Sequence, residues 1–250
     1  MALEIRPVHH VVVVVSWLLG MALISWRYLW QTTPLHRVEE QGDATDLPPS
    51  LPEELVDEHC QSAEQGVGAL FHRRFNVRIE EGELDARELM AVLKNDLNQA
   101  APSEAAVVDR TKGSEGRFRV GDEFVVRMPG PWNAPVRVVG CEETSFRLAT
   151  LKGHIEAGMI EFRARDEHDA VRFEIEAWAR PSTRVLHLLY ARMRLAKEMQ
   201  LNMWTRFCLH AATLARGRAR GGVGIHTRRV VLPAATESAH RPGNRTRVRP

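Results

Sequence analysis

The clearest helical periodicity in the chain lies near its C-terminus, between Thr183 and Ala215. Apolar residues recur there every three or four positions, and charged residues fill many of the positions between them. This spacing predicts one amphipathic helix about 50 Å long, which needs a large apolar surface to pack against. The apolar positions are Leu186, Leu189, Met193, Ala196, Met203 and Phe207.

Residues 117–179, immediately before this helix, alternate between apolar and polar with the period of β-strands. Turn residues divide them into about six strands, as in an antiparallel meander. An earlier strand from Phe71 to Ile79 and a helix that begins near Asp85 precede them. The order predicts an α+β fold in which a curled antiparallel sheet surrounds the long C-terminal helix. The inward positions are Phe124, Val126, Phe146, Leu148, Phe162, Phe173 and Ile175.

An uncharged apolar run, Val11 to Trp26, precedes this body and extends to Trp30 if Arg27 reaches the headgroups. Twenty helical residues cover about 30 Å, the thickness of a bilayer core, so we expect one transmembrane helix. The alternatives are a cleaved signal peptide, which lacks a small-residue cleavage site here, and a buried helix of a soluble domain. The membrane-facing residues would be Val11, Val15, Leu18, Leu19, Leu23 and Trp26.

These patterns predict a membrane anchor at 1–30, a Pro-rich linker at 31–52, a folded body at 53–215 and a tail at 216–250. One arginine precedes the apolar run and two follow it, which favours a single-pass membrane protein with its body in the cytoplasm.

The formal net charge of +2 hides an asymmetry, because residues 216–250 hold nine arginines and one glutamate. We expect this tail to be disordered and to bind anionic lipid rather than nucleic acid, since it has no aromatic residue for base stacking. A solvated tail without a specific partner is the alternative. The three cysteines are far apart and not clustered with histidine, so we expect neither a disulfide framework nor a metal or cofactor.

His154 and Glu156 are two positions apart and would share one face of a strand, where a histidine and a carboxylate could perform acid–base chemistry. Gly153 and Gly158 bracket them, which favours the alternative of a tight turn that enters a strand.

Two further residues have both a functional and a structural interpretation. Trp132, between prolines, would either close one end of a cavity or fill a hydrophobic corner. Arg180, before Pro181, would bind either an anionic ligand group or, as a structural residue, an acidic neighbour or a helix end.

Three motifs carry a resemblance to a known family. They are Pro129-Gly130-x-Trp132-Asn133-x-Pro135, Gly153-His154-x-Glu156-x-Gly158 and Ala177-x-x-Arg180-Pro181. In these residues the chain resembles the family catalogued as domain of unknown function nineteen-ninety. That family lies within the helix-grip superfamily (SRPBCC), with START lipid-transfer domains, birch-pollen-allergen-like proteins and aromatic polyketide cyclases. Ala179 stands where such family members tend to have serine, so any role of that serine is absent here.

The resemblance implies a cavity between sheet and helix and names no substrate. We therefore expect the body to bind a hydrophobic small molecule or lipid, with a cyclase- or isomerase-like enzyme and a protein-interaction module as alternatives. The expected cavity residues are Trp132, His154, Glu156, Phe173, Arg180, Leu189 and Met193.

Overall fold

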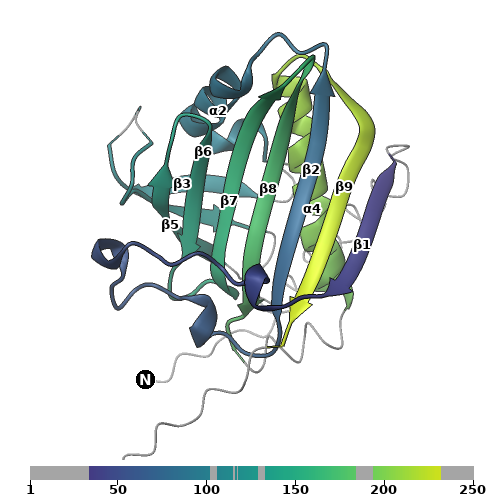
Figure 1. The fold of residues 1–250 in the computed structure, drawn as a ribbon. Helices are drawn as coiled ribbons and strands as arrows, with labels where there is room; N and C mark the ends of the chain where they lie inside the picture. The colour runs from purple at the N-terminus through teal and green to yellow at the C-terminus, as the bar shows by residue number, and fades with distance from the viewer. Residues whose placement is uncertain are drawn as a thin grey trace, which may run out of the picture.

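The computed structural model describes residues 34–101, 106–114, 116, 118–128, 133–183 and 194–231. Strands from both ends of this region join one nine-stranded sheet in the order β1-β9-β2-β8-β7-β6-β5-β4-β3 (Figure 1). Every neighbouring pair is antiparallel except β1 and β9, which are parallel. The strands are β1 (Leu35–Gln41), β2 (Leu70–Glu80), β3 (Val107–Lys112), β4 (Glu123–Arg127), β5 (Asn133–Cys141), β6 (Ser145–Thr150), β7 (Glu156–Glu167), β8 (Ala170–Pro181) and β9 (Arg218–Val230).

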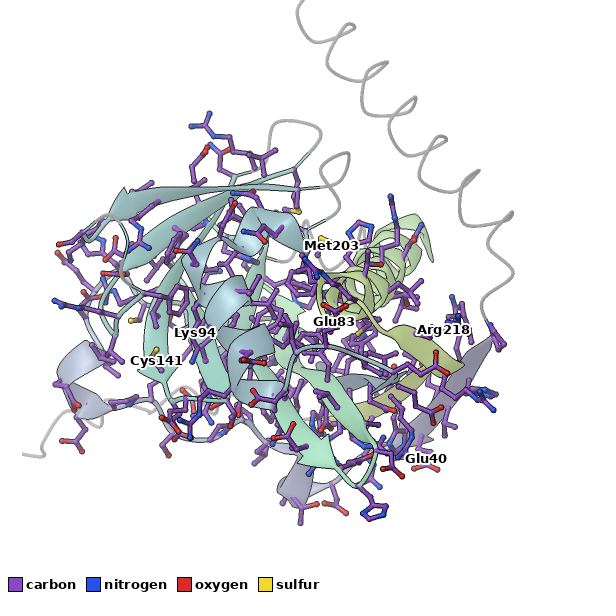
Figure 2. The ribbon with its side chains drawn as sticks, turned by 90° about the horizontal axis from the view of Figure 1, so that it is seen from above. Glu40, Glu83, Lys94, Cys141, Met203 and Arg218 are labelled. Atoms are coloured by element: carbon purple, nitrogen blue, oxygen red, sulfur yellow. The ribbon has the colours of Figure 1, made fainter. Side chains whose placement is uncertain are left out.

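Two α-helices lie inside the curve of the sheet, as the view from above shows (Figure 2). Helix α2 (Ala86–Asn95) begins at Asp85, and a capping box with Glu88 satisfies its first backbone N–H groups, so the helix predicted near Asp85 is confirmed. Helix α4 (Arg194–Leu214) packs on β2, β8 and β9. Short 3-10 helices are η1 (Ala44–Asp46), η2 (Glu53–Leu55), η3 (Ala63–Gln65) and η4 (Leu97–Gln99).

The core lies between the concave face of the sheet and these helices. Strand alternation sends one set of side chains inward, so that Phe75 on β2 faces Ile175 on β8, and Ile175 faces Phe162 on β7. The predicted inward positions are confirmed, since all are buried except Val126, which is partly buried. A curled antiparallel sheet around a C-terminal helix is the helix-grip arrangement that the resemblance implied.

The chain on either side of the predicted body contributes to the sheet, which corrects two expectations. Part of the predicted linker forms β1, and part of the predicted disordered tail forms β9, which lies between β1 and β2. Val223 and Ile225 on β9 are buried beside Val77 and Phe75, so burial of apolar surface holds this strand in place. The body therefore extends past residue 215.

The arginines at the start of the predicted tail are not free to form a cationic segment, because they form ion pairs within the body. Each lies beside a glutamate at the end of β2 or just after it, where opposite charges attract across neighbouring chain segments. The pairs are Arg216 with Glu83, Arg218 with Glu81 and Arg220 with Glu80. The remainder of the predicted tail, 232–250, lies outside the described residues.

The membrane expectation also requires correction. Within the described ranges, no helix combines the length and the apolar character needed to cross a bilayer. This finding contradicts the predicted localisation as a single-pass membrane protein with a cytoplasmic body. The expected anchor at 1–30 lies outside the described residues, as do residues 184–193 of the predicted long helix.

A strap, defined here as residues 42–66, crosses the convex face of the sheet opposite the helices (Figure 1). It covers a second, smaller apolar cluster that includes Leu70, Met159 and Trp178, against which Ala63 packs. A backbone hydrogen bond from Lys152 N to His59 O, 2.7 Å long, joins the strap to the β6–β7 turn. Both faces of the sheet are therefore covered in this part of the fold.

The position of β9 leads to a stability prediction. Replacement of Ile225 by Ala removes a side chain that is 3% exposed, and should lower the free energy of unfolding by about 2–5 kcal/mol. The control Val38→Ala alters a residue of β1 that is 48% exposed and should change it by less than about 0.5 kcal/mol. Urea unfolding measures both, and equal small effects would contradict the insertion of β9.

Candidate functional site

The interface between sheet and α4 is filled by aromatic rings over part of its length. The Phe207 ring lies 5.2 Å from Phe162 on β7 and 6.1 Å from Phe173 on β8, centroid to centroid. Phe146 on β6 stacks on Phe162 at 4.7 Å. Phe173 was an expected cavity residue, but it is fully buried and belongs to this packed region.

Further along the same strands, the inward residues become small. Ala177 and Ala179 on β8 lie beside Ile160 and Gly158 on β7. Gly158 has φ of +151°, and a Cβ there would lie 1.9 Å from the carbonyl oxygen of Trp178, so only glycine fits. This small-residue floor, defined as Gly158, Ala177 and Ala179, offers much less side-chain volume to α4 than the phenylalanines do.

A polar bridge connects α4 to both sides of this floor. The Gln200 side chain donates from Nε2 to Glu156 Oε2 at 2.8 Å, and its Oε1 accepts from the Arg73 guanidinium of β2. Arg73 is 2% exposed and Glu156 is 9% exposed. Since a buried charge is costly unless it is hydrogen-bonded, this bridge stabilises both charges beneath the helix.

The side chains between the aromatic region and the polar bridge are less completely covered. Ile160, in the middle of β7, and Trp204, one helical turn after Gln200, are apolar and remain partly exposed. The indole ring of Trp204 meets Phe162 edge-on, with the centroids 5.7 Å apart. The candidate site therefore lies above Ile160, bounded by Trp204 on one side and by the Gln200 bridge on the other.

His154 and Glu156 do not form a side-chain pair. His154 lies in the turn before β7, where its Nδ1 accepts a hydrogen bond from the backbone N–H of Glu156 at 2.9 Å. Gly153 adopts φ of +98° in that turn. Burial lowers the pKa of His154 to about 4, so the imidazole is neutral at pH 7. The tight-turn interpretation accounts for these contacts.

Arg180 lies on the convex face, away from α4. Its guanidinium donates to the carbonyl oxygens of Gly68, at 2.6 Å from Nη2, and of Ala63, at 3.1 Å from Nη1. It therefore holds the end of the strap against β8. The other expected cavity residues, Trp132, Leu189 and Met193, lie outside the described residues.

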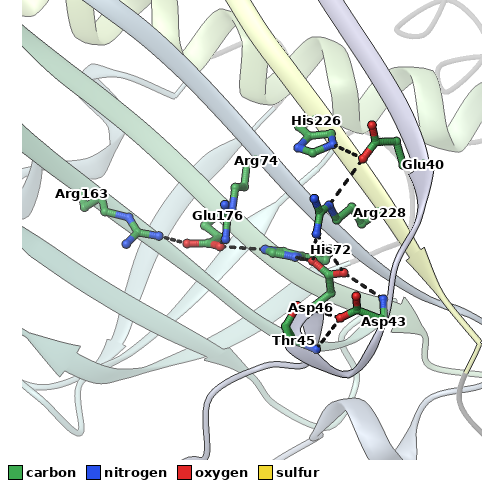
Figure 3. Close-up of polar contacts among 10 residues, drawn as sticks. All are labelled: Glu40, Asp43, Thr45, Asp46, His72, Arg74, Arg163, Glu176, His226 and Arg228. Atoms are coloured by element: carbon green, nitrogen blue, oxygen red, sulfur yellow. Dashed lines mark hydrogen bonds and ion pairs between the residues drawn. The ribbon is translucent and has the colours of Figure 1, made fainter.

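The convex face holds a buried polar network that was not predicted from the sequence (Figure 3). The His72 ring lies between two buried carboxylates, with Nδ1 2.9 Å from Asp46 of the strap and Nε2 2.7 Å from Glu176 of β8. The same ring stacks on Trp178 at 5.1 Å. Burial lowers the pKa of His72, while the hydrogen bond to Asp46 opposes that shift.

Arginines complete this network by binding the two carboxylates. Arg74 and Arg163 bind Glu176, and Arg228 of β9 lies 3.4 Å from Asp46. The cluster thus connects the strap, β2, β7, β8 and β9 through paired charges (Figure 3). No group of three or more His, Cys, Asp or Glu side chains in the described ranges is arranged to hold a metal ion.

The strap also supports the Glu156 end of the candidate site. Gln61 Nε2 donates to the carbonyl oxygens of His154, at 2.9 Å, and of Glu156, at 2.7 Å. Gly158 N donates to Gln61 O at 3.0 Å. The start of β7 is therefore held by the strap from the convex side, while Gln200 reaches it from the concave side.

Sequence reasoning missed Arg73, Gln200 and Trp204. A signal for Arg73 was present, because it occupies the same strand phase as Phe71, Phe75 and Val77. Trp204 stands three positions before Phe207 on the helix, and Gln200 stands seven positions before it, two turns away on the same side. Their polar or partly polar character placed them outside the apolar stripe.

Solved structures with a similar course of the chain include norcoclaurine synthase from Thalictrum flavum in complex with dopamine and hydroxybenzaldehyde. It is 10% identical, with a TM-score of 0.42, and the match covers 68% of this chain and 100% of that chain. Ara h 8.0201 is 9% identical, with a TM-score of 0.41 and coverage of 58% and 98%. At identities this low, the ligands and activities of those proteins are not assigned to this chain.

The di-domain ARO/CYC StfQ from the steffimycin biosynthetic pathway is 10% identical, with a TM-score of 0.41 and coverage of 59% of this chain and 53% of that chain. No curated protein matches the sequence significantly. A family model, described as domain of unknown function DUF1990, matches residues 62–211, which is more than half of the chain. The motifs that carried the resemblance around Gly153–Gly158 and Ala177–Pro181 lie within that range, and the chain belongs to the DUF1990 family.

Proposed function

We propose that this protein binds a hydrophobic small molecule between the small-residue floor and α4. The observation that carries the proposal is the partial exposure of Ile160, an apolar residue in the middle of a nine-stranded sheet on the face that α4 covers. Ligand sites are concave and mostly apolar, with a few polar groups that orient the ligand. Here Arg73, Gln200 and Glu156 supply the polar groups.

The geometry of helix and strand supports the proposal. Gln200 contacts Glu156, and Trp204 contacts Phe162. The helix rises only about 6 Å over those four residues, whereas the strand advances about 20 Å over the corresponding six. The two helix side chains must therefore diverge toward their partners, and this divergence favours space above Ile160 between them.

The cyclase-like alternative would require His154 and Glu156 to act together as acid and base. The Nδ1 atom of His154 is occupied by the Glu156 backbone N–H, and the pKa of the imidazole is about 4. A general acid or base works best with a pKa near the working pH. No observation in the described part of the chain favours catalysis over binding.

Substitution of Ala177 by Phe tests the proposed space directly. The ring should occupy the space above the floor, weaken binding of the probe ethylnaphthalene at least about tenfold and reduce stability by less than about 1 kcal/mol. Equilibrium dialysis and urea unfolding measure the two effects. The matched control is Ala164→Phe, because Ala164 faces Phe173 within the aromatic region and is 3% exposed.

Overpacking a filled core typically costs about 1–3 kcal/mol, and we expect that cost for Ala164→Phe. Equal destabilisation by both variants, together with no measurable binding of ethylnaphthalene to the wild type, would show a filled interface and overturn the proposed function.

The structural role of His154 predicts a pH dependence. Its pKa is about 4 when folded, against about 6.5 for an unperturbed histidine. Between these values the unfolded chain takes up a proton that the folded chain does not, so the stabilisation is complete above about pH 6.5. It is lost as the pH falls toward 4, by on the order of 1–3 kcal/mol.

His154→Gln removes this titration, and its amide oxygen can accept the same hydrogen bond from Glu156 N. The unfolding free energy of the wild type minus that of the variant should therefore fall between about pH 7 and pH 4, because only the wild type loses this stabilisation. An NMR titration of His154 with a midpoint near 6.5 would refute this assignment and reopen the catalytic alternative.

A further inference from the structure

The His72 side chain on the convex face has two hydrogen-bond partners that a neutral imidazole cannot both satisfy (Figure 3). Its Nδ1 lies 2.9 Å from Asp46 Oδ1, and its Nε2 lies 2.7 Å from Glu176 Oε1. An ionised carboxylate only accepts hydrogen bonds, whereas a neutral imidazole carries a single N–H. One of the two contacts would therefore bring two acceptors together at hydrogen-bond distance. Both contacts are satisfied when the cluster holds one additional proton.

The surrounding charges indicate which group carries that proton. The arginine pairs are Arg74 of β2 and Arg163 of β7 with Glu176, and Arg228 of β9 with Asp46. Asp46 also accepts a hydrogen bond from the backbone N–H of Asp43 at 3.0 Å, and Glu40 of β1 lies 3.8 Å from Arg228. Arginine contacts favour ionised carboxylates, so the additional proton belongs on His72.

Several effects act on the charged form of His72. Burial lowers the pKa of this histidine, the hydrogen bond to Asp46 raises it, and the charge of Arg74 lowers it again. The ring also stacks on Trp178, with the centroids 5.1 Å apart, and a cationic group is attracted to the face of an indole. The contact with Glu176 decides the balance, because without a proton on Nε2 two lone pairs would face each other across 2.7 Å.

Loss of this proton would affect the strap more than the sheet. His72 and Glu176 lie on neighbouring strands, β2 and β8, whose separation is fixed by backbone hydrogen bonds. Asp46 instead belongs to the 3-10 helix η1 of the strap, and its contact with His72 joins this part of the strap to the sheet. Asp57 and Gln61 attach the strap independently at later positions. The segment around η1 is therefore the part that can move when the cluster loses its proton.

We propose that η1 is a proton-dependent latch, fastened to the sheet while His72 carries a proton on each ring nitrogen and released when one of these protons passes to water. In the released state the ring meets solvent, where a histidine has a pKa of about 6.5. The fastened state keeps the proton to a higher pH, so the latch is closed below about pH 6.5 and opens as the pH rises through the value at which the closed cluster deprotonates. This inference does not require a ligand above Ile160.

Nitrogen NMR of the full chain labelled with 15N-histidine tests the protonation, with the His72 signals assigned by their absence from His72→Gln. At about pH 7.5, where an unperturbed histidine is mostly neutral, both ring nitrogens of His72 should carry a proton. The midpoint of its titration should lie at least about one unit above the unperturbed value. A ring with a single N–H at about pH 7.5, as burial alone would produce, overturns the proposal.

The methyl signals of Ala44, Thr45 and Leu47 report the latch itself, because methyl protons do not exchange with water. In the wild type they should shift with the same midpoint as the His72 ring. If the ring titrates as expected while these signals stay constant, the proton has no effect on the strap, and the latch is overturned.

Asp46→Asn separates the proton from the contact. The side-chain amide of the variant can donate to Nδ1 of a neutral His72 ring, its oxygen can still accept from the Asp43 N–H, and the Nε2 proton serves Glu176. The latch then needs no additional proton, so the pH-dependent shift of the methyl signals should disappear and the signals should keep their fastened positions.

The matched control is Asp57→Asn, which removes another strap carboxylate, one that lies 2.8 Å from Arg137. Burial raises the pKa of Asp57, but hydrogen bonds from Arg137 and the His59 backbone lower it to about 2, so this carboxylate does not titrate in the range tested. The control should keep the wild-type midpoint. Loss of the transition in Asp57→Asn, or its persistence in Asp46→Asn, overturns the latch. If urea unfolding shows that Asp46→Asn is not folded, the wild-type titration alone decides the proposal.

Discussion

The position of α4 depends on the contact of Phe207 with Phe162 and Phe173, which fixes one part of the helix against β7 and β8. Phenylalanines bury large areas and pack closely, so this contact leaves little freedom in the distance between helix and sheet. At Ala177 and Gly158 the sheet presents much smaller side chains to the same helix. The candidate site follows from this change in side-chain size along two strands.

The convex face supports the site from behind. His72, between Asp46 and Glu176, fixes one end of the strap to the sheet through buried charged contacts. Further along the strap, Gln61 holds the backbone carbonyls of His154 and Glu156. Loss of one partner in a buried charged pair is strongly destabilising, so this covering is well fixed in the folded protein. The strap thereby positions the carboxylate end of the site without contributing a side chain to it.

Much of the fold could be predicted because local pattern and tertiary structure agree. The alternation in β2 reports its buried face, and the capping box at Asp85 marks where α2 begins. Phe207 of the predicted helical stripe is buried, whereas Met203 is partly exposed. Strand β9 was missed because its arginines and glycines are typical of a solvated tail, and its burial depends on pairing with β2, which is distant in sequence. Register between distant segments is not encoded in local spacing.

The site was harder to predict than the fold. The glycines around His154 predicted the turn, because the positive φ of Gly153 requires a residue without a side chain. The polar bridge and the contact of Trp204 with Phe162 depend on which helix residue meets which strand residue. Helix periodicity places Gln200 and Trp204 on a flank of α4 but does not indicate that Glu156 and Phe162 are their partners.

The proposed hydrophobic ligand lies above Ile160, between Trp204 and the Gln200 bridge. An NMR experiment on the protein saturated with ethylnaphthalene tests this placement most directly, through nuclear Overhauser effects between the probe and the side chains. We expect contacts from the probe to the Ile160 methyl groups and to the Trp204 ring, and none to Trp178 on the convex face. Contacts confined to the convex face or to the outer surface of α4 would contradict it.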